Sequence, residues 1–278
     1  YGTRLYPSTK CISKQIIPVY DKPMIYYPLS TLMEANIRDI LIISTPNDMP
    51  FFQKLLDDGS QFGISIQYEI QDEPKGIAQA FIIGENFING HPSCLILGDN
   101  IFYGAGLPQI LQQASNSSKI STIFSYKVND PHRFGVVEMD ANDNVLSIEE
   151  KPIEPKSKYA VTGLYFYDKN ASKYAKELKP SYRGELEITD LNNIYLRKNM
   201  LKTVKMSKGY AWLDTGTPES LLEASNFIHT IEKRQGSKIS CPEEIALENN
   251  WVNPETILKN INKSNSYNDY IKTLINEI

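Results

Sequence analysis

Short apolar runs rich in isoleucine, valine and leucine alternate with segments of helical periodicity through the first third of the chain. Three of these runs are predicted to be strands, namely DILIIS (39–44), SIQYEI (65–70) and CLILGD (94–99). The intervening segments 50–59 and 75–88 carry apolar residues at helical spacing and predict helices, the first of which ends at Gly59. Strand, helix and strand in this order are typical of right-handed crossover units in a parallel sheet.

The pattern changes in the middle of the chain, where strand-like runs follow one another closely. These runs are ISTIFSYKV (120–128), FGVVEMD (134–140), NVLSIEEK (144–151) and YAVTGLYFYD (159–168). The segment MDANDNV, between the second and third runs, has the composition of a hairpin turn. We expect antiparallel or mixed additions to the first sheet, followed by helices at 171–179 and 187–199.

The segment 217–236 has the clearest helix signals in the chain. Thr217 suits the N-cap, Pro218 suits the first helical position, and Gly236 suits the stop. The polar, asparagine-rich residues 237–278 show only weak helical patterns, at PETILKNI and YNDYIKTLINEI. We therefore predict an α/β fold in which residues 1–236 form a core, with a mixed, mostly parallel sheet flanked by helices, and residues 237–278 form a small helical appendage.

Composition and charge narrow the class of protein. The chain has 278 residues, 41% of them hydrophobic, and a net charge of −4. Because its lysines and arginines are scattered, nucleic acid and anionic membranes are not expected partners. The three cysteines are widely spaced with no C-x-x-C pair, so a disulfide framework and a structural zinc site are not expected. No run approaches the ~20 apolar residues of a membrane span, and no signal peptide is visible. These features favour a cytoplasmic protein.

Two aspartates follow apolar runs and are candidate metal ligands. Asp99 ends the run CLILGD, and Asp214 ends GYAWLD just before the helix at 217–236. Ligands of open α/β sheets bind at the carboxyl ends of strands, so carboxylates there are expected in the cleft. Two such groups could share one Mg²⁺ together with phosphate oxygens. The structural alternative for Asp99 is a turn or N-cap aspartate.

The opening stretch YGTRLYPSTKCISKQ combines glycine, threonine and arginine, which suits a loop that wraps an anion. Arg4 and Lys14 flank this irregular segment, although an exposed lysine is the ordinary interpretation of Lys14. Glu150 and Lys151, in EEKP, could equally form a strand-end salt bridge of little consequence. The stretch GELEITD after Arg183 could be a simple capping segment. The three histidines are isolated in sequence, which gives no support to a histidine triad or a zinc cluster.

Taken together, the motifs of this chain resemble those of the sugar-phosphate nucleotidyltransferases, and most closely the glucose-1-phosphate thymidylyltransferase branch. The matching segments, in the order of that family, are GTRLYPSTKCISKQIIPVYDKPMIYYPL, QDEPKGIAQA, LILGDN, RFGVVE, EEKP, YAVTGLYFYD, RGELEITD and GYAWLDTG. The resemblance spans essentially the whole chain and implies a Rossmann-like fold with sugar-binding β additions. The family's first strand and leading Gly-Gly do not precede Tyr1, so GTR is expected to be the second half of a triphosphate-binding loop.

The resemblance implies that the phosphate of α-D-glucose 1-phosphate attacks the α-phosphorus of magnesium-bound dTTP, giving dTDP-glucose and pyrophosphate. In this scheme Arg4 stabilises the departing pyrophosphate, Lys14 the α-phosphate, and Lys151 the sugar phosphate. Asp99 and Asp214 would hold Mg²⁺.

The resemblance also implies two sets of binding residues. Gln71 and Gly76 would read the thymine edge, and the full set expected at the nucleotide is Gly2, Thr3, Gln15, Gln71, Pro74, Gly76 and Asp99. Glu150, Gly135 and Val161 would face the sugar, and Arg183 would contact its phosphate. The full set expected at the glucose 1-phosphate substrate is Asn100, Gly135, Glu150, Lys151, Val161 and Arg183. A homotetramer is implied as well, together with feedback inhibition by dTDP-rhamnose. We expect a second, regulatory nucleotide site at a subunit interface that involves the tail after Gly236, and the structural alternative is a tail that merely covers apolar surface.

Two other classes of function remain open from the sequence. A nucleotide-sugar glycosyltransferase shares the general fold, but it usually carries a D-x-D metal motif, whereas Asp99 is followed by Asn100 and Ile101. A non-catalytic, nucleotide-sugar-binding regulatory paralogue should have lost a charge at the reaction centre, but Arg4, Lys14, Asp99, Lys151 and Asp214 are all present.

Overall fold

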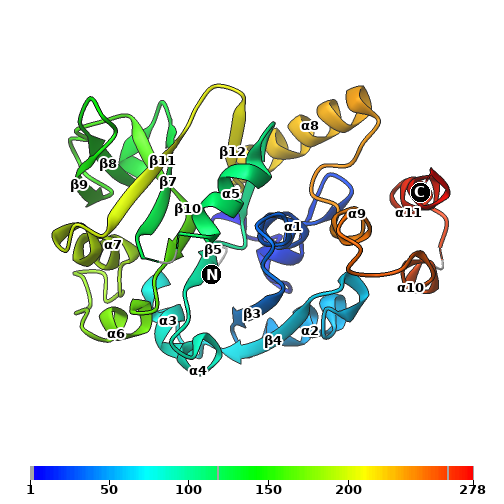
Figure 1. The fold of residues 1–278 in the computed structure, drawn as a ribbon, viewed down its shortest axis with the longest axis horizontal. Helices are drawn as coiled ribbons and strands as arrows, with labels where there is room; N and C mark the ends of the chain where they lie inside the picture. The colour runs from blue at the N-terminus through cyan, green and yellow to red at the C-terminus, as the bar shows by residue number, and fades with distance from the viewer. Residues whose placement is uncertain (1–2, 118, 262, 278) are drawn as a thin grey trace. The chain divides into compact units, whose positions relative to one another are not determined.

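The computed structural model describes residues 3–117, 119–261 and 263–277, with Thr3 described by its backbone alone (Figure 1). The chain divides into two compact units. Unit 1 comprises Tyr1–Tyr68, Gly98–Tyr103 and Leu213–Ile278, and unit 2 comprises Glu69–Leu97 and Gly104–Trp212. Each unit is therefore assembled from segments that are distant in sequence.

Unit 1 places short strands among helices. Its first half contains the hairpin β1 (Pro18–Val19) and β2 (Lys22–Pro23), the helix α1 (Tyr26–Glu34), the strand β3 (Asp39–Ser44), the helix α2 (Met49–Leu56), the 3-10 turn η3 (Ser60–Phe62) and the strand β4 (Ser65–Ile70), which pairs with β3. Its second half contains the helices α8 (Pro218–Gln235), α9 (Pro242–Glu248), α10 (Pro254–Asn260) and α11 (Ser266–Glu277). The strands β6 (Asn100–Gly104) and β12 (Tyr210–Asp214) pair with each other.

Unit 2 is built on a six-stranded sheet in the order β11-β7-β10-β8-β9, with β5 also paired to β10. The strands are β5 (Ser93–Ile96), β7 (Ser121–Lys127), β8 (Gly135–Met139), β9 (Val145–Glu150), β10 (Tyr159–Tyr167) and β11 (Leu201–Met206). The helices of the unit are α3 (Ala80–Ile83), α4 (Glu85–Ile88), α5 (Leu107–Ser115), α6 (Ala171–Lys176) and α7 (Ile188–Arg197). β11 and β7 are parallel, whereas β10 is antiparallel to β5, β7 and β8, and β8 is antiparallel to β9.

The core of unit 2 lies where β10 meets α3, α6 and α7, and it is rich in aromatic side chains. Phe81 packs edge-on against Tyr167, and Tyr167 packs against Tyr195. The two buried hydroxyls are satisfied, because Tyr167 donates to Asn192 Oδ1 at 2.5 Å and Tyr195 donates to Asp168 Oδ1 at 2.6 Å. A buried tyrosine hydroxyl needs a hydrogen-bond acceptor, so these two bonds fix the position of α7 on the sheet.

The mixed α/β fold expected from the sequence is confirmed. The strands at 39–44 and 65–70 match the predicted runs residue for residue, and the β8–β9 hairpin forms as expected. Its turn is held by Asp140, whose Oδ1 accepts the backbone N–H groups of Asn142 and Asn144. α8 begins and ends as predicted, with Thr217 as N-cap in a capping box and Gly236 in the left-handed conformation.

Some of the predicted boundaries are wrong. The expected helix at 75–88 is a 3-10 turn, η4 (Ile77–Gln79), followed by two short helices that Gly84 separates. Glycine weakens a helix interior because its backbone loses the most freedom on ordering. The expected helix at 50–59 ends at Leu56, since Asp57 takes a φ of 48°. The run CLILGD does not remain a strand to Asp99, because β5 ends at Ile96.

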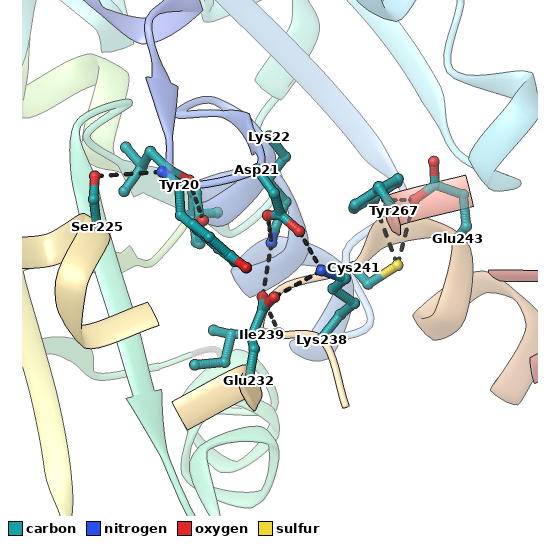
Figure 2. Close-up of polar contacts among 12 residues, drawn as sticks. Tyr20, Asp21, Lys22, Ser225, Glu232, Lys238, Ile239, Cys241, Glu243 and Tyr267 are labelled. Atoms are coloured by element: carbon teal, nitrogen blue, oxygen red, sulfur yellow. Dashed lines mark hydrogen bonds and ion pairs between the residues drawn. The ribbon is translucent and has the colours of Figure 1, made fainter. Parts of the chain in front are cut away.

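A charged network fastens the β1–β2 hairpin of unit 1 to the end of α8 (Figure 2). Glu232 Oε1 accepts from Lys22 Nζ at 3.1 Å and from the Ile239 N–H at 3.0 Å, while its Oε2 accepts from Lys238 Nζ at 2.8 Å. Asp21 accepts from both lysines. The Lys22 side chain is only 1% exposed, and the carboxylates of Asp21 and Glu232 compensate its buried positive charge.

The tail after Gly236 has an apolar cluster of its own. Cys241, Leu247, Ile257 and Ile271 are buried together, and α9 packs on α1. Tyr267 donates to Glu243 Oε2 at 2.6 Å, and Tyr270 donates to Glu244 Oε1 at 2.7 Å. Within the described residues, no helix is both long and apolar enough to cross a bilayer.

Removing the central carboxylate of the charged network should destabilise unit 1. We expect Glu232→Gln to lower the free energy of unfolding by about 3 kcal/mol, because Lys22 would stay buried with only one anionic partner. Glu223→Gln, on the exposed side of the same helix, is the control and should change it by less than about 0.5 kcal/mol. Urea unfolding measures both variants, and equal stabilities would show that the network is not a stabilising element.

Candidate active site

Lys14 and Asp99 form an ion pair in unit 1. Lys14 opens the 3-10 turn η2 (Lys14–Ile16), and Asp99 lies in the turn between β5 and β6. Both side chains are 16% exposed. Asp99 Oδ1 also accepts from Asn100 Nδ2 at 3.1 Å. The pairing is inconsistent with an exposed, unpaired Lys14.

Arg4 and Asp214 meet beside Gly216. A Cβ atom added to Gly216 would lie 3.1 Å from both Arg4 Nη2 and Asp214 Oδ1. Thr215, the residue between Asp214 and Gly216, donates its hydroxyl to the Asp99 carbonyl at 2.7 Å and its N–H to the same oxygen at 3.2 Å. These bonds hold the backbone that carries Asp214 against the backbone that carries Asp99.

Gln15 belongs to the same neighbourhood of unit 1. Its carbonyl accepts the Ile25 N–H at 2.9 Å, and its side chain accepts from the Ser13 hydroxyl. A Cβ added to Gly98 would lie 2.9 Å from Gln15 Cγ. The absence of a side chain at Gly98, directly before Asp99, therefore leaves the space that the Gln15 side chain occupies. The structure therefore brings together Arg4, Lys14, Gln15, Asp99, Asn100 and Asp214.

The donor set of Asp99 and Asp214 fits Mg²⁺. This ion is usually held by one or two carboxylates together with waters and substrate phosphates, not by a complete protein cage. Among the described residues, no group of three or more histidine, cysteine, aspartate or glutamate side chains is arranged to hold a metal ion.

A second cluster in unit 2 surrounds Glu150. Gly135 of β8 stands opposite Glu150 of β9 in the register of the hairpin. A Cβ on Gly135 would lie 3.2 Å from Thr189 Oγ1, 3.4 Å from Glu150 Oε2 and 3.9 Å from Val161 Cβ. Thr189 donates to Glu150 Oε2 at 2.6 Å, which fixes the orientation of that carboxylate. Glycine at 135 thus keeps one side of Glu150 open.

Arg183 and Lys151 bring positive charge to Glu150. Arg183 Nη2 lies 3.5 Å from Glu150 Oε1, and Lys151 Nζ lies 3.8 Å from the same oxygen. Arg183 also binds Glu187 through two nitrogens, at 3.0 and 2.7 Å, and this hydrogen bonding raises the pKa of the guanidinium. Lys151 has a φ of 44°, an uncommon backbone conformation for a residue with a side chain. Such outliers concentrate at functional sites.

A loop of unit 2 carries Gln71, Pro74 and Gly76. Gly76 has a φ of 102°, and a Cβ there would lie 2.3 Å from the Leu186 carbonyl oxygen. The loop is bonded to the same residue on both sides, since the Leu186 N–H donates to Lys75 O at 2.7 Å and the Ala78 N–H donates to Leu186 O at 3.1 Å. Only glycine fits this close backbone approach.

The structure thus gathers the predicted residues into three groups, each within one unit. Gly2 lies outside the described residues, and the side chain of Thr3 is likewise not described. Sequence reasoning missed three supporting residues, Thr189, Glu187 and Gln79. The last of these accepts a hydrogen bond from Gln71 Nε2 at 2.8 Å. These three residues lie in the motifs RGELEITD and QDEPKGIAQA, which also contain Arg183 and Gln71. Their position in these motifs could have indicated that they support the site.

Residues 1–231 match the model of the nucleotidyl transferase family, which makes the chain a nucleotidyltransferase by fold and sequence. It is 57% identical to glucose-1-phosphate thymidylyltransferase of Neisseria gonorrhoeae over 99% of this chain and 96% of the relative. It is 59% identical to the Xanthomonas campestris pv. campestris enzyme of the same name over 92% of this chain and 87% of the relative. A solved Bacillus anthracis structure, described as a candidate glucose-1-phosphate thymidylyltransferase with sucrose, superposes with a TM-score of 0.75 at 44% identity, covering 81% of this chain and 90% of that one.

The chain belongs to the glucose-1-phosphate thymidylyltransferase family. It is therefore an enzyme, and the glycosyltransferase and the non-catalytic paralogue are both disfavoured by relatives that match along nearly its whole length.

Proposed function

We propose that this enzyme transfers a thymidylyl group from dTTP to α-D-glucose 1-phosphate, forming dTDP-glucose and releasing pyrophosphate. The observation that carries the proposal is the convergence of Arg4, Lys14, Asp99 and Asp214 from separate segments of unit 1. Two cations beside two carboxylates suit a nucleoside triphosphate with its metal, because transfer at phosphorus demands alignment and charge neutralisation more than covalent chemistry.

In the proposed reaction a phosphate oxygen of glucose 1-phosphate attacks the α-phosphorus of dTTP, and the bond from that phosphorus to the pyrophosphate oxygen breaks. Arg4 neutralises the departing pyrophosphate. Lys14 neutralises the α-phosphate and the leaving oxygen. Asp99 and Asp214 would hold Mg²⁺, which when bound supplies positive charge that orients the triphosphate.

The residues of unit 2 bind the two organic parts of the substrates. Gln71 and Gly76 read the thymine edge. Glu150, whose carboxylate is oriented by Thr189, accepts hydrogen bonds from hydroxyl groups of the glucose. Arg183 and Lys151 neutralise the sugar phosphate, a role that suits lysine as a compact cation. The remaining proposed contacts with the nucleotide are those of Gly2, Thr3, Gln15 and Pro74. Gly135 and Val161 face the sugar, and Asn100 contacts the same substrate.

The product, dTDP-glucose, would serve dTDP-rhamnose synthesis for surface polysaccharide. The enzyme would act in the cytoplasm as a homotetramer, and dTDP-rhamnose would inhibit it by feedback. Residues 1–236 would then act as the catalytic core and residues 237–278 as an interface. Support for this wider assignment comes from the family membership of the chain.

Pyrophosphate release over a matrix of nucleoside triphosphates and sugar 1-phosphates tests the proposed reaction. We expect the highest kcat/KM for dTTP with glucose 1-phosphate. A preference for another triphosphate or another sugar 1-phosphate by tenfold or more would reject the assignment.

Lys151→Ala should impair the use of glucose 1-phosphate more than the binding of dTTP. We expect its KM for glucose 1-phosphate to rise about tenfold or more, because a hydrogen bond to a charged group contributes roughly 1.5–3 kcal/mol. Lys156→Ala is a matched control from the same loop, since Lys156 is exposed and contacts Glu149. Calorimetry of dTTP and steady-state kinetics separate the two ligands, and equal losses for both would assign Lys151 a purely structural role.

A further inference from the structure

Gln79 is a polar residue that the proposed mechanism does not use, and its side chain sits at the centre of the Gln71–Gly76 loop. Its Oε1 accepts from Gln71 Nε2 at 2.8 Å and from the Lys75 backbone N–H at 3.1 Å. The Lys75 N–H is shared with the Glu73 carbonyl oxygen at 2.9 Å. Gln79 is the last residue of the 3-10 turn η4. The preceding residue of the same turn, Ala78, is fully buried, so the fold fixes the position of Gln79.

These two bonds determine which way the Gln71 amide faces. A backbone N–H is only a donor, so the Gln79 atom beside Lys75 must be the oxygen. That oxygen is only an acceptor, so the Gln71 atom beside it must be the amide nitrogen. The orientation of a glutamine amide is usually ambiguous, but the Lys75 N–H settles it here.

The fixed orientation leaves a defined pattern of hydrogen-bonding groups on Gln71. One N–H of its amide is used by Gln79, and within the described residues its Oε1 accepts no hydrogen bond. Gln71 therefore presents an acceptor oxygen beside its second N–H donor. The edge of thymine is the complement, because its N3–H donates and the flanking carbonyl oxygens accept.

Cytosine requires the opposite arrangement. At N3 and position 4 of cytosine, N3 accepts and the exocyclic amine donates, which is the reverse of thymine. A Gln71 amide that reads these two positions could pair with cytosine only after turning over. Turning the amide would place Gln71 Oε1 against Gln79 Oε1, which removes a hydrogen bond and sets two acceptors face to face. An unmade bond of this kind in a partly buried site is costly.

We propose that Gln79 is a positioning residue for base specificity, which holds Gln71 in the orientation that accepts the imide edge of thymine or uracil and rejects cytosine. This inference rests on the proposed function, in which Gln71 reads the base. Gln79 would then be the residue that enforces the choice of base through Gln71.

Binding and turnover of dTTP and dCTP by a set of single variants test the proposal. Gln79→Met keeps the length of the side chain but lacks a strong acceptor, and we expect it to lower the dTTP-to-dCTP ratio of kcat/KM about tenfold or more. Gln79→Glu keeps the acceptor and should stay within about threefold of the wild-type ratio. Gln113→Leu, at an exposed position of α5, is the control and should leave the ratio unchanged.

A double variant separates positioning from general support of the fold. If Gln79 acts through Gln71, adding Gln79→Met to Gln71→Met should not change the base ratio further. A purely structural role of Gln79 would lower activity with dTTP and dCTP equally and would leave the ratio of each Gln79 single variant at the wild-type value. Such a result overturns the proposal.

Thermal melting checks that each variant folds. If Gln79→Met does not fold, Gln79→Lys replaces it, because an ammonium group attracts Gln71 Oε1 and should turn the amide toward cytosine. A dTTP-to-dCTP ratio unchanged in that variant would likewise overturn the proposal.

Calorimetry without sugar phosphate distinguishes this inference from the proposed function. A wild-type protein that binds dTTP more tightly than dCTP but transfers no thymidylyl group would reject the function, and the Gln79 variants would still decide the inference. A wild-type protein that binds both nucleotides equally would overturn the inference alone.

Discussion

Asp214→Asn and Asp99→Asn are each expected to reduce kcat by about a hundredfold or more, with the fold retained. An amide keeps the size of the carboxylate but not its charge, so the affinity for a hard divalent cation falls. In Asp99→Asn the partner of Lys14 is lost as well, because the two side chains form an ion pair.

The matched control is Asp143→Asn, at an exposed turn position where Asp143 contacts Lys205 and has a φ of 61°. Asparagine tolerates this conformation, so activity should be unchanged. Steady-state kinetics over a titration of Mg²⁺ measures all three variants. Near-normal turnover of either test variant at saturating Mg²⁺ would remove that aspartate from the metal site.

Gly76→Ala is expected to raise the KM for dTTP about tenfold or more and to destabilise unit 2. The added methyl group would lie 2.3 Å from the Leu186 carbonyl oxygen, which belongs to the backbone and has no side-chain freedom to move aside. The loop that carries Gln71 must therefore shift, and the Gln71–Gln79 bond at 2.8 Å shifts with it.

Gly209→Ala is the control for the conformational cost of placing alanine at a positive φ. Gly209 has a φ of 107°, close to the 102° of Gly76, but an added Cβ would meet nothing within 4 Å. Both variants bear the cost of a positive φ, about 1–3 kcal/mol, and only Gly76→Ala adds the clash. Nucleotide calorimetry with thermal melting compares them, and identical behaviour would mean that the close approach to Leu186 has no role in binding.

Local rules predicted the best-formed elements well. The helix α8 follows its capping residues, because Thr217, Pro218 and Gly236 each act within one turn of the chain. The strands β3 and β4 follow their apolar runs because each is bounded by turn residues. Elements determined by tertiary packing were not predicted. The helix α1 buries seven of its nine residues and carries no polar face from which its period could be recognised.

The residues of the site could be predicted from the sequence only where they lie inside a motif of the family. Lys14 and Asp99 lie 85 positions apart in the chain, and spacing alone could not show that they pair. The same holds for Thr189 and Glu150, which lie 39 positions apart. The amide of Gln79 could not be assigned from sequence either, because its role depends on which backbone N–H the folded loop presents to it.

The fate of the α-phosphorus tests the central claim most directly. The full protein is incubated with glucose 1-phosphate, Mg²⁺ and dTTP that carries a label on its α-phosphorus or, separately, on its γ-phosphorus. We predict that the α-label appears in dTDP-glucose and that the γ-label appears in pyrophosphate. Recovery of the α-label in dTMP, or of the γ-label in inorganic phosphate or in a phosphorylated sugar, would contradict thymidylyl transfer.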